Sequence, residues 1–314
     1  MRALAKLLQP LILILALAFI AALVRSQWSQ LQSHPWRLAP GWLILSGLVL
    51  VISWLVELSI WRALLARVGG RLPWPRAARI WFLSALVRYV PGNVWQPLGM
   101  TALARERGVR PEATVTSIAL YQAINLLAVL PIALAYLLLE GSALGPLLGE
   151  SRGWRLLAGG ALLPIVVFLG RPAWLVTLVN WGLSRLGRPA LPVRLTSRGI
   201  LGLLAAALVD WLLWGLALTG LGLALNAFPL ERVGVLLPYL LVSFPLAYAV
   251  GYLSFITPGG LAVREGALVL LLAPVLDGGA ATLLALALRL WQVILELAAA
   301  GIVALAIPGK TEVA

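Results

Sequence analysis

Long apolar runs separated by short arginine-rich stretches dominate this sequence. Six runs come close to or exceed the roughly 20 residues with which a helix crosses a bilayer, and they lie near residues 8–24, 40–61, 114–139, 156–170, 199–226 and 280–307. Two further apolar segments, 80–103 and 233–276, are interrupted by Pro-Gly. The pattern predicts an all-α polytopic membrane protein with about six to eight transmembrane helices and one or two re-entrant broken-helix hairpins.

The two interrupted segments share a short motif. Residues 88–93 read RYVPGN, and residues 255–260 read FITPGG. Proline lacks a backbone donor and glycine adopts conformations that other residues avoid, so each motif is expected to end one helix and start another. Such paired interruptions at membrane depth are typical of the binding sites of transporters.

Arginines set the predicted topology. The stretches 62–79 and 171–198 each hold five arginines and no acid, and the positive-inside rule places both in the cytoplasm. Two clear spans separate them, so 80–103 must cross the membrane an even number of times, and about 24 residues are too few for two crossings. This segment is therefore predicted to be re-entrant, whereas 233–276 could be re-entrant or form two full spans. Both chain termini are then cytoplasmic.

A single transmembrane domain is expected over residues 1–314. Its parts are a signal-anchor helix in 1–39, a first half-repeat in 40–139, a connector with an interfacial helix in 140–198, and a second half-repeat in 199–314. The two half-repeats are expected to be inverted copies, because the span before each interruption runs in the opposite direction in the other half. Spacing agrees: Gln122 and Asn125 follow Pro91 as Arg289 and Gln292 follow Pro258.

Composition fits this class and excludes several others. Hydrophobic residues make up 62% of the chain, and the net charge of +13 comes from arginines between apolar runs, which indicates a membrane surface and no nucleic-acid partner. The 14 tryptophans are expected mostly near span ends, in an aromatic belt. There is no cysteine and only one histidine, His34, and no phosphate-binding P-loop is present, so no metal, cofactor or catalytic triad is expected.

Ionisable residues inside apolar spans are the main functional candidates, because charge within a membrane is costly. Arg289, Gln292 and Glu296 recur at i, i+3 and i+7 and so lie on one helical face. This polar stripe could bind substrate or form a structural ion pair with another helix. Asp210 lies near mid-span, where it needs a tertiary partner or a proton, and it could couple transport to protons.

The interruptions favour an anionic ligand. Free N–H groups at the start of each following helix suit a phosphate, and Arg88 would add a charge-assisted contact unless it reaches to the membrane interface instead. No catalytic residue is predicted. The predicted substrate-binding residues are Arg88, Tyr89, Pro91, Gly92, Asn93, Gln96, Pro258, Gly259, Gly260, Arg264, Glu265, Arg289, Gln292 and Glu296.

Both motifs resemble those of a known family. Residues 89–92 (YVPG) with Gly99, Arg105 and Gly108 downstream, and residues 258–266 (PGGLAVREG), are similar to the two signatures of the lysylphosphatidylglycerol synthase transmembrane-region family of flippase-like proteins. The resemblance covers essentially the whole chain, and Arg289 matches a commonly basic position. It implies movement of a lipid between leaflets: aminoacylated phosphatidylglycerol in the best-understood members, polyprenyl-linked glycolipids in others.

Two departures from the family pattern matter. Members often carry Glu-Arg and then Asp where this chain has Tyr121-Gln122 and Asn125, which leaves the lipid and any coupling ion open. The 314 residues also hold no counterpart of the soluble aminoacyl-transferase domain of bifunctional members. The protein is therefore not expected to make the lipid itself.

The leading hypothesis is a lipid flippase-like transporter of the cell (inner) membrane, acting on a phospholipid or a polyprenyl-linked lipid. Its partners would be a membrane lipid with an anionic or aminoacylated headgroup, or a polyprenyl phosphate, and a lipid-modifying enzyme. One alternative is an intramembrane glycosyl- or lipid-transferase with Glu265 or Asp210 as base. Another is a non-catalytic partner of such an enzyme.

Overall fold

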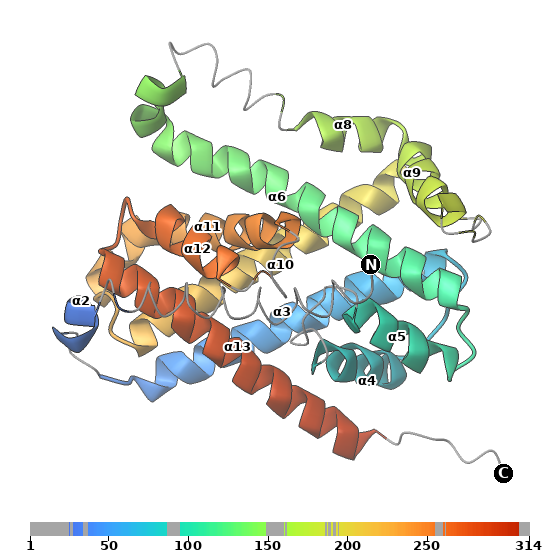
Figure 1. Cartoon of the computed structure of the whole chain (residues 1–314), viewed down its shortest axis with the longest axis horizontal. Helices are drawn as coiled ribbons and strands as arrows, with labels where there is room; N and C mark the ends of the chain where they lie inside the picture. Colours follow the sequence, from blue (N-terminus) through green and yellow to red (C-terminus); the bar gives the residue numbers. More distant parts are fainter. Residues whose placement is uncertain are drawn as a thin grey trace, which may run out of the picture. The chain divides into compact units, whose positions relative to one another are not determined.

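The structure is a computed structural model, and it is helical with no strand in the part of the chain that it describes (Figure 1). The described residues are 25, 28–33, 37–86, 95–148, 160, 162–185, 187, 190, 193, 195–254, 260 and 262–307. This confirms the prediction of an all-α protein.

Five described helices are long and apolar enough to cross a membrane. The span-length segments are Pro40–Arg67 (α3), Pro111–Leu139 within α6 (Pro111–Leu148), Ser197–Ala224 (α10), Leu230–Leu253, which joins the short helix η2 (Leu230–Arg232) to α11 (Val233–Leu253), and Gly278–Ala306 (α13). A sixth span results if α8 (Leu163–Gly170) and α9 (Pro172–Arg185) form one broken crossing. The predicted span 8–24 lies outside the described residues, as does the first part of 156–170.

The first interrupted segment holds two short helices. Helix α4 (Trp74–Ala85) has 12 residues and α5 (Trp95–Arg105) has 11. At about 1.5 Å per residue, each is well short of the roughly 30 Å hydrocarbon core. Their lengths fit the predicted re-entrant segment, whose predicted turn at Pro91-Gly92 lies outside the described residues.

The second interrupted segment is divided unequally. Helix α11 has 21 residues, whereas α12 (Val263–Leu272) has only 10. Ten residues rise about 15 Å, which is too little to cross a bilayer. Among the described residues, one span-length helix is therefore followed by one short helix, and the choice between a re-entrant segment and two full spans in 233–276 stays open.

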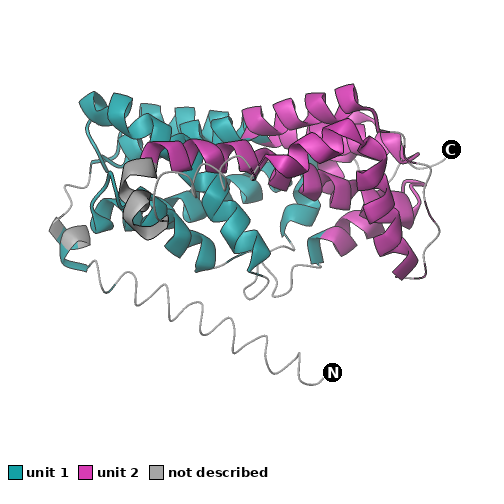
Figure 2. Ribbon diagram, turned by 90° about the horizontal axis from the view of Figure 1, so that it is seen from above, with its two compact units in different colours: residues 1–53, 82–96, 211–314 teal, residues 54–81, 97–210 magenta. Residues whose placement is uncertain are grey.

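The chain forms two compact units, which Figure 2 colours separately. Unit 1 consists of Met1–Ser53, Phe82–Gln96 and Trp211–Ala314, and unit 2 consists of Trp54–Trp81 and Pro97–Asp210. Each unit combines segments from both predicted half-repeats. The inverted repeat itself stays a prediction.

Small residues bring helices of unit 1 together. A Cβ at Gly215 in α10 would overlap the backbone of Leu241 in α11, and one at Gly220 would lie 3.3 Å from Cβ of Ser46 in α3. Ser46 Oγ donates a buried hydrogen bond of 2.7 Å to the carbonyl oxygen of Ala217. Close backbone approach through small residues drives helix packing where lipid removes the hydrophobic advantage of large ones. Gly215 and Gly220 therefore act as packing residues.

Several tryptophans are buried, in unit 1 as well as in unit 2. Trp61 Nε1 donates a hydrogen bond of 3.0 Å to Ser117 Oγ, and its ring lies 5.7 Å from that of Trp81, which meets Tyr121 edge-on at 5.3 Å. The belt stays a prediction, and five described tryptophans pack inside the protein, where their indole N–H groups can find partners. These are Trp54, Trp61, Trp81, Trp211 and Trp214.

Candidate functional site

Two glycines fix the start of α12 against α11. Gly260 has a φ of +68°, and a Cβ at this position would lie 3.0 Å from backbone atoms of Gly251. A Cβ at Gly251 would in turn lie 2.9 Å from Cβ of Arg264. Only glycine fits both positions without displacement. The two glycines therefore allow the start of α12, with Arg264 in its first turn, to pack directly against α11. Ala262, the residue before α12, also has a φ of +68°.

Gly251→Ala is expected to lower the free energy of unfolding by about 1–3 kcal/mol, the usual effect of overpacking. The new methyl group would press on the Cβ of Arg264, which is fixed to the backbone and cannot turn away. Gly234→Ala in the same helix is the matched control, because nothing lies within 4 Å of its added Cβ. Detergent–SDS unfolding followed by tryptophan fluorescence measures both, and equal stability of the two variants would contradict the close contact of α11 with α12.

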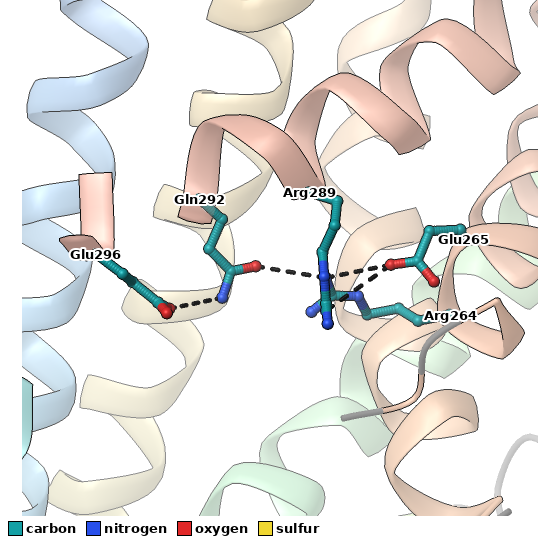
Figure 3. A network of polar contacts seen from close by, with 5 residues as sticks. All are labelled: Arg264, Glu265, Arg289, Gln292 and Glu296. Carbon is teal, nitrogen blue, oxygen red and sulfur yellow. Dashed lines mark hydrogen bonds and ion pairs between the residues drawn. The ribbon is translucent and has the colours of Figure 1, made fainter. Parts of the chain in front are cut away.

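Five polar side chains from α12 and α13 form a connected set, here called the α12–α13 network (Figure 3). Arg264 Nη2 lies 3.4 Å from both Glu265 Oε1 and Gln292 Oε1. Arg289 Nη1 lies 3.8 Å from the same oxygen of Glu265. Gln292 Nε2 donates a hydrogen bond of 2.8 Å to Glu296 Oε1. The stripe predicted on α13 therefore exists, and α12 supplies its ion-pair partner.

The network is buried, formally neutral and loosely bonded at Glu265. Residue exposure is 7% for Arg264, 2% for Glu265, 3% for Gln292 and 2% for Glu296, and the side chain of Arg289 is 15% exposed. Two arginines balance two glutamates, as buried charges require. Yet the contacts of Glu265 at 3.4 and 3.8 Å exceed the roughly 2.7–2.9 Å of a strong charge-assisted bond. Its second oxygen, Oε2, is buried without a hydrogen-bond partner.

The ring of Phe244 in α11 lies beside Arg264 and belongs to an aromatic cluster of α10 and α11. Arg264 Cζ lies 5.6 Å from the ring centroid of Phe244, which stacks on Trp214 at 4.5 Å. Tyr248 lies 5.0 Å from Trp211, and Tyr252 follows Tyr248 by one turn. Sequence reasoning missed this cluster, although Phe244, Tyr248 and Tyr252 recur at four-residue spacing, which places them on one helical face.

The other predicted site residues are divided between the units or lie outside the described part of the chain. Gly260 is buried beside the network, and Gln96 is half-buried at the second position of α5. Asp210 is buried in unit 2, where it takes part in an interaction as its burial requires. The residues outside the described ranges, whose predicted roles stay predictions, are Arg88, Tyr89, Pro91, Gly92, Asn93, Pro258 and Gly259.

Metal-binding chemistry has no counterpart in the described ranges. Among these residues, no three His, Cys, Asp or Glu side chains gather as a metal ion would need. With its two guanidiniums, two carboxylates and one amide, the α12–α13 network can bind charged groups.

Comparison with known families identifies the relationship of the chain. Its residues 7–300 match the family described as the lysylphosphatidylglycerol synthase TM region. The chain belongs to this family. The match contains both Pro-Gly motifs and the whole α12–α13 network, and it confirms the resemblance seen in the motifs. Membership of the lysylphosphatidylglycerol synthase TM family, together with the span-length helices, makes this a multi-pass membrane protein with a role related to membrane lipids. A search among curated proteins gave no match.

Proposed function

We propose that the protein is a lipid flippase-like transporter of a cell inner membrane, which moves a phospholipid or a polyprenyl-linked lipid between the leaflets. The observation that carries this proposal is the α12–α13 network, a set of four charges and one amide buried in a chain of apolar spans. Replacement of a buried ion pair by apolar residues is often neutral or stabilising. Stability alone therefore gives no reason for these charges, whereas recognition of a polar headgroup does.

The proposed ligand group is the phosphate of the lipid headgroup. Arg264 and Arg289 both approach one oxygen of Glu265 at longer than ideal distances. A phosphate offers more oxygens with higher charge density, and guanidinium groups bind it in a bidentate manner. The positive end of the α12 dipole, next to Arg264, adds to this attraction. Phosphate would thus replace Glu265 as acceptor for the two arginines.

The remaining network residues have a second role in this proposal. Gln292 and Glu296, joined by a 2.8 Å hydrogen bond, would orient the arginines or meet a cationic group of the headgroup. The acyl or prenyl tails would stay in the bilayer. No metal or cofactor is part of this proposal.

The order of helix lengths supports two related halves. In the first half the lengths are 28, 12, 11 and 38 residues for α3, α4, α5 and α6. In the second half they are 28, 21, 10 and 29 residues for α10, α11, α12 and α13. Each half thus has a long helix, an interrupted pair and another long helix. In the proposed mechanism one half rocks against the other, with the first motif (residues 88–93) as the counterpart of the second.

Arg264→Gln and Arg289→Gln are each expected to slow lipid transfer about 10- to 100-fold, the effect of one lost charge-assisted contact. Each substitution keeps a polar side chain and removes the guanidinium that would hold the phosphate. The measurement is the rate at which a headgroup-fluorescent anionic phospholipid in proteoliposomes becomes accessible to external dithionite. Arg198→Gln, which changes an exposed arginine in the first turn of α10, is the control and should transfer lipid at the normal rate.

Two results would contradict the proposal. The first is a folded wild-type protein that transfers neither phospholipid nor prenyl phosphate. The second is a normal rate in both arginine variants, which would remove the α12–α13 network from the transport path. Conversion of a labelled lipid donor into product by the purified protein would instead support the transferase alternative.

A further inference from the structure

Helices α8 and α9 form a right-angled pair within unit 2. They are bent by 96° at a break of one residue, Arg171 (Figure 1). Arg171 has φ −136° and ψ +77°, which ends α8. Pro172 then opens α9, because proline fits the first turn of a helix but cannot continue the preceding one. If apolar α8 runs through a membrane, the bend turns α9 toward the membrane plane.

Helix α9 has three different faces. Leu175 and Leu183 are buried on the face toward the protein, where α9 contacts α6. A second face consists of Trp174, Leu178 and Trp181, which recur at i, i+4 and i+7 and are exposed by 52%, 55% and 57%.

The third face of α9 is polar. Thr177 and Ser184 are exposed there, and their hydroxyl groups donate to carbonyl oxygens of their own helix at 3.0 and 2.7 Å. Helix α9 thus has one face against the protein, one apolar and aromatic face, and one polar face. This arrangement is expected of a helix that lies in a membrane interface.

Arginines cap both ends of the aromatic face. Arg171 Cζ lies 5.8 Å from the ring centroid of Trp174, and Arg185 Cζ lies 5.1 Å from that of Trp181. The helix itself, PAWLVTLVNWGLSR, contains no acidic residue. Tryptophan rings favour the headgroup level of a bilayer, so a guanidinium stacked on each ring is at the depth of lipid phosphates.

We propose that α9 is a binding site for anionic phospholipids at the membrane surface. Trp174, Leu178 and Trp181 enter the boundary between headgroups and acyl chains, and Arg171 and Arg185 bind phosphates of neighbouring lipids. The lipids belong to the cytoplasmic leaflet, because the positive-inside rule places the arginine-rich stretch 171–198 on that side. These lipids are bound at the protein surface, so the site is independent of the proposed transport.

The competing arrangement is a broken span in which α9 crosses the bilayer. It would place the hydroxyl face of α9 at Thr177 and Ser184 in the hydrocarbon core. It would also leave one of the two stacked arginines far from any phosphate on its own side. Interfacial binding avoids both consequences.

The sequence lacks cysteine, so single-cysteine variants need no background removal. Leu178→Cys and Ser184→Cys place an NBD fluorophore on the aromatic face and on the polar face of the same helix. In phosphatidylcholine vesicles, the label at 178 should be quenched by doxyl-labelled lipid and resist dithionite. The label at 184 should react rapidly with dithionite. In vesicles made permeable to dithionite, a label at 184 that resists it like the one at 178 shows a crossing helix, and a label at 178 that reacts rapidly shows no insertion; either overturns the proposal.

The same probe at 178 tests the choice of lipid. Doxyl-labelled phosphatidylglycerol should quench it about two-fold or more above doxyl-labelled phosphatidylcholine at equal concentration. The double variant Arg171→Gln with Arg185→Gln should bring this ratio close to one. The double variant Arg171→Lys with Arg185→Lys keeps both charges and should keep the ratio. Arg37→Gln, which changes an exposed arginine of unit 1, should also keep it. A ratio near one in the parent protein, or an unchanged ratio in the double Gln variant, overturns the assignment of the arginines to phosphates.

Discussion

Glu265→Gln is expected to lower the free energy of unfolding by about 3–5 kcal/mol, the usual effect of removing one partner from a buried ion pair. Two guanidiniums approach the same Glu265 oxygen, at 3.4 Å from Arg264 and 3.8 Å from Arg289. Without the carboxylate, the network holds two positive charges and only the negative charge of Glu296. Because the site is buried, water cannot screen the excess charge. Unfolding in detergent–SDS mixtures, followed by tryptophan fluorescence, measures the loss.

Two further variants separate the charge effect from other causes. Glu231→Gln removes an exposed carboxylate in η2 and should change stability by no more than about 0.5 kcal/mol. The double variant Glu265→Gln with Arg289→Gln restores neutrality, so it should lose less than the sum of the single variants, by about 0.5–3 kcal/mol. If Glu265→Gln were as stable as Glu231→Gln, the ion pairs of the network would not hold α12 to α13.

Gly215→Ala should lower the free energy of unfolding by about 1–3 kcal/mol or more. Its Cβ would overlap the Cα of Leu241 and lie 3.0 Å from the carbonyl oxygen of Leu240. Backbone atoms cannot rotate out of the way as the end of a side chain can. Relief therefore requires that α10 and α11 move apart, which exposes packed surface along both helices.

Gly202→Ala provides a control of opposite sign in the same helix. No atom lies within 4 Å of a Cβ added at Gly202, so the substitution adds only helix propensity. It should raise the free energy of unfolding by roughly 0.5–1 kcal/mol. The same unfolding titration compares the two, and a shift in the same direction for both would contradict the close packing of α10 on α11.

The main helices and the polar stripe could be predicted from the sequence. The apolar runs 40–61, 199–226 and 280–307 became α3, α10 and α13 with ends displaced by a few residues, because the hydrophobicity that a membrane helix needs is a local property of the chain. The stripe of Arg289, Gln292 and Glu296 followed from helical periodicity alone. The motifs around 91 and 258 were sufficient to indicate the family to which the chain belongs.

Helix lengths beside the interruptions could not be predicted in the same way. Proline and glycine at 258–260 indicated that the helix breaks there, but not that 21 residues precede the break and 10 follow it. Burial of Trp61 and Trp211 was missed for a related reason. Trp61 lies at the end of the predicted span 40–61 and Trp211 in the middle of 199–226. At either position a tryptophan can face lipid or the protein interior, and only the neighbouring helices decide between them.

By itself, the sequence determined the class of the protein, the positions of its long helices, its family and the helical face that carries the charged residues of α13. Only the tertiary structure decided that Glu265 stands between two arginines, that Gly251 admits Arg264, and that Phe244 covers it. The physical reason is that periodicity along one helix fixes which side chains share a face, whereas the partner of that face depends on the packing of helices distant in the sequence.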